Sequence, residues 1–108
     1  MIFTMLGQGR EGATRACREA GVRQIGDVLD WCALEPDVFA ASVVADSSWC
    51  AQQAVRDLCA GTLATGARRS VGLERPDVCR LAMHPDTPEA LRQRVQALHA
   101  AAMDYTAA

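Results

Sequence analysis

Apolar positions recur every three to four residues along most of the chain, and this spacing predicts helices rather than strands. The pattern over Arg10–Ala20 predicts a first helix, which ends at Gly21 because glycine readily takes the left-handed conformation that closes a helix. Residues 22–33 are predicted to form a second helix. Its apolar face would consist of Val22, Ile25, Val28, Leu29 and Cys32.

The middle of the chain gives a mixed pattern. Asp37–Ala45 is almost wholly apolar and is interpreted as a short central helix, although its FAASVV segment is also compatible with a strand. Ser47 is expected to cap a helix that runs to Ala60 and stops at Gly61. Residues 62–73 are predicted to be a flexible connection, and residues 1–9 a flexible arm, because glycines interrupt both.

The stretch 36–61 resembles the stretch 76–101, forty residues further along the chain. Ungapped alignment gives eight identities in 26 positions, and the identities include Pro-Asp-Val at the start of each copy. In the second copy, a short helix, a proline-marked turn and a longer helix are expected, with a stripe of Leu91, Val95, Leu98 and Ala102. A period near forty suits stacked helix pairs, and two similar hairpins in a small bundle are the alternative.

These patterns predict an all-α fold: five or six helices arranged in helical hairpins, in a single domain over residues 1–108. Residues 81–91, LAMHPDTPEAL, resemble the core of the leucine-rich repeat variant, a HEAT-like helical repeat. This resemblance implies that the His-Pro-Asp-Thr-Pro turn joins a short helix to a longer one. It implies no catalytic chemistry.

A second resemblance concerns residues 12–31. The segment Ala16–Val22 followed by Trp31 is similar to the helix-turn-helix of small bacterial and phage DNA-binding proteins. That resemblance implies a recognition helix beginning at Val22. Asp27 and Asp30 would lie on this helix and repel phosphates, so the alternative is a plain helical hairpin turned by glycine.

Composition narrows the function classes. The net charge is −2, and no basic tail or charged run is present, which disfavours general nucleic-acid binding. No apolar run approaches the length of a membrane span, so a soluble cytoplasmic protein is expected. The five cysteines lack metal-ligand spacing and are interpreted as core residues, with a cysteine-ligated metal protein as an alternative.

No catalytic motif is recognisable, so we expect a non-enzymatic protein without a cofactor. The leading hypothesis is a protein-interaction module, such as an adaptor, a small chaperone or an inhibitor, that binds another protein or a second copy of itself. Trp49, Arg68 and Arg69 are the candidate partner-binding residues. Tryptophan and arginine are enriched at the energetic centres of protein interfaces, and Arg68 and Arg69 lie in the glycine-flanked connection.

Overall fold

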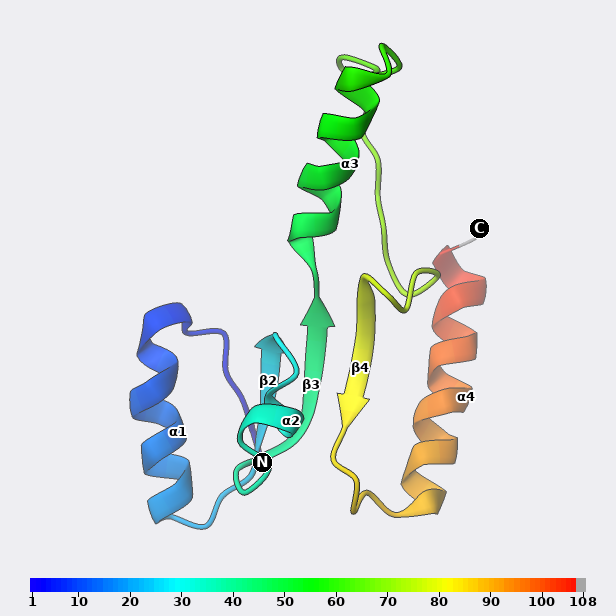
Figure 1. Cartoon of the computed structure of the whole chain (residues 1–108). Helices are drawn as coiled ribbons and strands as arrows, with labels where there is room; N and C mark the ends of the chain where they lie inside the picture. The colour runs from blue at the N-terminus through cyan, green and yellow to red at the C-terminus, as the bar shows by residue number, and fades with distance from the viewer. Residues whose placement is uncertain (107–108) are drawn as a thin grey trace.

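The computed structural model describes the backbone of residues 1–106 and the side chains of residues 1–103. It contains an α/β fold in which helices alternate with a four-stranded sheet (Figure 1). The strands are β1 (Ile2–Phe3), β2 (Gln24–Val28), β3 (Phe39–Ala45) and β4 (Cys79–Met83). The helices are the 3₁₀ turn η1 (Gly7–Gly9), α1 (Arg10–Glu19), α2 (Trp31–Leu34), α3 (Ser47–Cys59) and α4 (Glu89–Thr106).

The all-α prediction, including the HEAT-like helical repeat, is therefore wrong. The strand order is β1-β2-β3-β4, with β1, β2 and β3 parallel and β4 antiparallel to β3. Residues 81–91 form the end of β4, a turn and the start of α4, rather than a turn between two helices. The β1–α1–β2 and β2–α2–β3 segments are βαβ units, which explains the alternation of helix and strand.

The predicted helix over residues 22–33 is the largest single error. Its apolar residues are spread over three environments: Ile25 lies in β2, Val28 and Leu29 are about half exposed, and Cys32 lies in α2. Alternate residues at the start of β2 are buried, as expected of a strand, but the buried residues are Gln24 and Gly26. A buried glutamine and a buried glycine give no apolar signal, so the sequence pattern pointed to the wrong period.

The predictions of helices near residues 10–20 and 47–60 are confirmed by α1 and α3. Gly21 and Gly61 follow these helices with φ of 63° and 68°, as expected of glycine stops. The cap of α3 is Asp46 rather than Ser47, since the Asp46 carboxylate accepts a hydrogen bond from the Ser48 amide. The short helix predicted over Asp37–Ala45 is wrong, because β3 occupies this segment, as its ambiguous pattern allowed.

One face of the sheet is covered by α1 and α2. The core on this side consists of Cys17, Trp31, Cys32, Val38 and Phe39, with Val22 packed against it. The backbone amide of Trp31 donates to Ser42 Oγ at 3.0 Å, and the indole Nε1 donates to the Asp27 carbonyl at 2.8 Å. These bonds fix α2 against β2 and β3.

A buried polar bridge joins β1, β2 and α1 at one end of this core. Gln24 is fully buried; its Oε1 accepts from Thr4 Oγ1 at 3.0 Å, and its Nε2 donates to Thr14 Oγ1 at 3.2 Å. A buried amide without partners would cost free energy, so the two threonines explain how glutamine is tolerated here.

The opposite face of the sheet is incompletely covered. Alternation along the paired strands places the apolar residues Ile25, Ala41, Val43, Leu81 and Met83 on this side, which we call the open face. Asp27, the register partner of Val43, lies on the same side. Leu91 and Val95 of α4 line the same groove as Ile25, Ala41, Leu81 and Met83, and this groove has a volume of about 380 Å³. The open face is therefore mostly apolar and is bordered by α4, and the groove between them is left open by the described side chains.

Helix α3 projects beyond the end of the sheet, and residues 60–71 return alongside it (Figure 1). We call α3 together with residues 60–71 the arm. The molecule measures 53 × 33 × 19 Å and has a radius of gyration of 16.9 Å. A compact domain of this length has a radius of about 13 Å, so the described chain is markedly elongated.

Arginine–aspartate contacts hold the Pro-Asp-Val turns that precede β3 and β4. Arg18 pairs with Asp37 and with Glu35, the latter at 2.8 Å, and Arg75 pairs with Asp77 at 2.6 Å. Hydrogen bonding from Arg18 lowers the pKa of Asp37, and hydrogen bonding from Arg75 lowers the pKa of Asp77.

Acid is therefore expected to weaken both turns. A carboxyl whose pKa is lower in the folded state stabilises the fold above the ordinary pKa of about 3.9, and this contribution is lost as the pH falls through the lowered value. We expect the free energy of unfolding to decrease as the pH is lowered from about 3.9 through the lowered pKa values of Asp37 and Asp77. Urea denaturation across a series of acidic buffers measures this decrease. Asp37→Asn should make the free energy of unfolding less dependent on pH in this acidic range. The same pH dependence in this variant as in wild type would contradict a stabilising role for the Arg18–Asp37 contact.

Candidate partner-binding site

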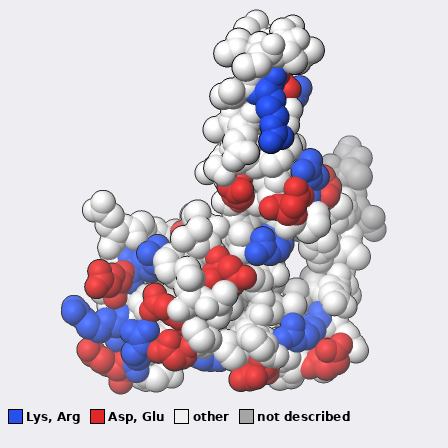
Figure 2. Space-filling view, in the orientation of Figure 1, with Lys and Arg blue, Asp and Glu red and all other residues white. Residues whose placement is uncertain are grey.

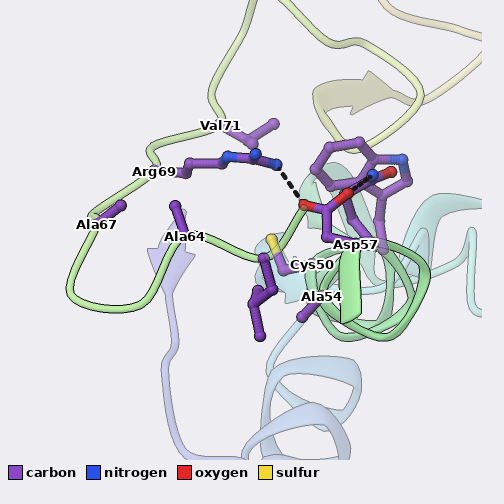
Figure 3. A pocket seen from close by; sticks show the side chains of 10 residues that line it. Cys50, Ala54, Asp57, Ala64, Ala67, Arg69 and Val71 are labelled. Carbon is purple, nitrogen blue, oxygen red and sulfur yellow. Dashed lines mark hydrogen bonds and ion pairs between the residues drawn. The ribbon is translucent and has the colours of Figure 1, made fainter. Parts of the chain in front are cut away.

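The arm contains a small cavity between α3 and the returning chain. The cavity has a volume of about 190 Å³ and is lined on the helix side by Trp49, Cys50, Gln53, Ala54 and Asp57. The returning chain contributes Leu63, Ala64, Ala67, Arg69 and Val71 (Figure 3). Pockets for drug-sized ligands usually exceed about 300 Å³, so this cavity matches one inserted side chain better.

An ion pair closes one side of the cavity. Asp57 accepts from Arg69 Nη1 at 2.9 Å and from Gln53 Nε2 at 2.8 Å, as Figure 3 shows for the Arg69 contact. The Asp57 side chain is only 15% exposed, whereas that of Arg69 is 65% exposed. Arg69 therefore neutralises a largely covered carboxylate and keeps its own side chain accessible to a partner.

Trp49 lies in the first turn of α3 and is half-buried. The Arg75 guanidinium sits 4.7 Å from the centre of its ring, which is a cation–π contact from the segment before β4. The structure thus brings Trp49 and Arg69, two of the three predicted partner-binding residues, to the same cavity. Arg68 is exposed on the returning chain and is not among the lining residues.

The predicted recognition helix of a DNA-binding protein has no counterpart at residues 22–31. Residues 24–28 form β2, and Trp31 starts the four-residue α2 with its ring buried in the core. A helix-turn-helix needs a second helix that is free to enter the major groove. A strand in the middle of a sheet cannot serve this role.

Metal ligands do not converge in the part of the chain that the structure describes, where no group of three or more Cys, His, Asp or Glu side chains could hold an ion. Cys17 and Cys32 are buried, Cys79 is half-buried, and Cys50 and Cys59 are exposed on α3. The prediction that the cysteines are core residues therefore holds for Cys17 and Cys32 and is wrong for Cys50 and Cys59.

These environments predict unequal thiol reactivity. Burial raises the pKa of Cys32, so less of the reactive thiolate forms there. A buried thiol reacts mainly through the small unfolded population, so Cys50 and Cys59 should be modified about 10³-fold faster than Cys32. Peptide mapping after timed alkylation measures this ratio, and equal rates at all three cysteines would contradict the fold.

A glycine motif between β1 and α1 went unused in the sequence interpretation. Gly7, Gly9 and Gly12 have the spacing Gly-x-Gly-x-x-Gly, are separated from the end of β1 by three residues and lead into α1. Gly7 has a φ of 51°, and Asp27, twenty positions later, lies near the end of β2. This spacing is similar to that of the glycine fingerprint of dinucleotide-binding βαβ units, and an all-α fold gives no reason to look for it because it has no strand before the glycines.

No protein-family model, no curated protein and no solved structure matches this chain. Among the helices of the described residues, none is both long and apolar enough to cross a bilayer.

Proposed function

We propose that this chain is a non-enzymatic protein-interaction module that binds its partner through the arm. The supporting observation is that α3 extends from the sheet with none of its residues buried. Val55 is 61% exposed and Leu58 is 64% exposed, so the helix presents apolar surface to solvent. Exposed apolar surface of this kind marks sites of association.

Helix energetics supports the same function. An isolated helix of 13 residues is marginal in water, because nucleation is costly and stability comes mainly from burying one face. The Asp46 cap and the Asp57–Arg69 pair supply only modest stabilisation to an exposed helix. A partner that covers the arm would supply the missing burial.

The distribution of charge fits a protein partner better than a nucleic acid. Figure 2 shows acidic and basic side chains interspersed over the body of the molecule, and mostly uncharged surface at the far end of the arm. Nucleic-acid interfaces are usually strongly positive. Trp49 and Arg69 at the cavity, with Arg68 beside it, are the residues that we expect to contact the partner.

The test is affinity capture of the tagged chain from its own cell lysate, with and without nuclease, followed by reconstitution with the purified partner. Trp49→Ala and Arg69→Ala should each weaken the reconstituted complex, by about 2 kcal/mol or more for an interface centre. Leu34→Ala, a substitution at a 61% exposed residue of α2, serves as the control. A complex that is insensitive to the arm variants, or one that dissolves with nuclease, would overturn the proposal.

A second candidate function is the binding of a nucleotide at the glycine turn, which the Gly7-x-Gly9-x-x-Gly12 motif favours. In open parallel sheets ligands bind at the carboxyl ends of the strands, and here the glycine turn follows the carboxyl end of β1 while Asp27 is the second-last residue of β2. Calorimetric titration with ADP and NADH tests this candidate. Saturable binding that is lost in Gly9→Val and weakened in Asp27→Asn would support it, and no heat of binding with either probe would exclude these ligands.

A further inference from the structure

The two copies of the repeat share a turn, a strand and a helix, and they meet in the sheet. Ser42 pairs with Ala82, which is the same position of the repeat forty residues later. An antiparallel pair centred on equivalent residues has a local two-fold axis at that point. The axis relates β3 to β4, and it relates Ala41 and Val43 of the open face to Leu81 and Met83.

The helices of the two copies carry equivalent apolar stripes. Ala51, Val55 and Leu58, which we call the arm stripe, correspond to Leu91, Val95 and Leu98 of α4. Leu91 and Val95 line the groove beside Leu81 and Met83, so the stripe of α4 borders the open face. The arm stripe is exposed, it is not among the residues that line the cavity of the arm, and it lines no part of the groove on the open face.

A five-residue turn folds α4 back along its strand. Residues 84–88 link β4 to α4, and they include Pro85 and Pro88, which stop the strand ladder and begin the helix. Arg92 fixes this turn by donating to the carbonyls of Thr87, His84 and Pro85 at 3.1, 2.7 and 2.8 Å.

The first copy of the repeat has no such five-residue turn between its strand and its helix. Asp46 alone links β3 to α3, the positions of the two prolines hold Ala45 and Ser48, and Gln52 replaces Arg92. Ordinary connections between a strand and a helix use about 2–6 residues. A single residue, already engaged as the cap of α3, leaves too little chain for α3 to lie back over its own strand.

From these observations we propose that α3 docks on the open face of a second copy of this chain, so that two chains exchange arms in a two-fold symmetric dimer. The arm stripe of each chain covers Ile25, Ala41 and Val43 of the other, as the stripe of α4 borders Leu81 and Met83. Short hinges are known to favour such exchange over closure within one chain. This inference rests on the proposed function, which makes the arm the binding element, and it assigns a second copy of the chain to the arm stripe rather than to the cavity.

The test measures the mass of the purified chain by size-exclusion chromatography with light scattering over a range of concentrations. Wild type should show twice the 11.6 kDa of one chain. The arm variant Val55→Asp/Leu58→Asp and the face variant Val43→Asp should each give the single-chain mass. Leu34→Asp, which is 61% exposed and outside both surfaces, should remain dimeric. Circular dichroism checks that each variant is folded.

Mixing the two variants distinguishes exchange from other dimers. The arm variant has an unaltered open face, and the face variant has an unaltered arm. The arm of the face variant can therefore dock on the open face of the arm variant, so the mixture should contain dimers that neither variant forms alone. A face variant that dimerises like wild type would indicate an arm-to-arm contact and overturn the inference. A monomeric wild type that still binds a different purified protein through Trp49 and Arg69 would overturn the inference and leave the proposed function standing, whereas a monomer without any partner would overturn both.

Discussion

Replacing Phe39 with alanine is expected to lower the free energy of unfolding by about 3–5 kcal/mol. Phe39 is fully buried at the start of β3, and its ring centre lies 5.7 Å from that of Trp31. Its removal would leave a cavity between the sheet and α2 and would take away the packing partner of Trp31. Small domains have total stabilities of about 5–15 kcal/mol, so the variant should be close to unfolded.

Urea denaturation followed by tryptophan fluorescence measures this loss, because Trp31 lies in the affected core. Phe3→Ala is the matched control, since Phe3 is 52% exposed on the edge strand β1 and should lose less than about 1 kcal/mol. Equal losses at both phenylalanines would show that the core is not where the structure places it.

Gly26→Ala is expected to destabilise the chain by about 1–3 kcal/mol, although it adds only one methyl group. A Cβ at Gly26 would overlap Cδ1 of the Trp31 ring and come within 2.9 Å of Ser42 Oγ. The ring cannot easily move away, because its Nε1 donates to the Asp27 carbonyl and the Arg10 guanidinium lies 3.6 Å from its centre on one face.

Gly12→Ala should instead increase the free energy of unfolding. A Cβ at Gly12 meets nothing within 4 Å, and alanine in place of glycine in the first turn of α1 should stabilise the helix by up to about 0.5–1 kcal/mol. Thermal melts of the two variants measured together give this comparison directly. A Gly26→Ala protein at least as stable as wild type would contradict the close approach of Trp31 to β2.

The sequence predicted the helices better than the strands, and the reason is local. α1, α3 and α4 carry apolar residues at helical spacing and have glycine stops or caps, so propensity and pattern agree. β2 shows its period only in burial, since its buried residues are glutamine and glycine. Gln24 is tolerated in the core because it forms hydrogen bonds with Thr4 and Thr14, and these tertiary contacts cannot be seen in a single sequence.

The candidate site was predictable in part. The enrichment of tryptophan and arginine at interface centres makes Trp49 and Arg69 candidates from the sequence, and the fold brings both to one cavity. The contribution of Asp57 could not be anticipated, because its contact with Arg69 spans twelve residues and depends on the path of the returning chain. The repeat was visible in the sequence, but its unit is a turn, a strand and a helix rather than a helical hairpin.

The proposed function requires that a partner, rather than the rest of the same chain, covers α3. Hydrogen–deuterium exchange of peptides covering Ser47–Cys59, measured in dilute and in concentrated protein, tests it most directly. We expect fast exchange at high dilution and strong protection at high concentration or with a bound partner, while β3 stays protected throughout. Equal and strong protection of α3 in the dilute, isolated chain would contradict it.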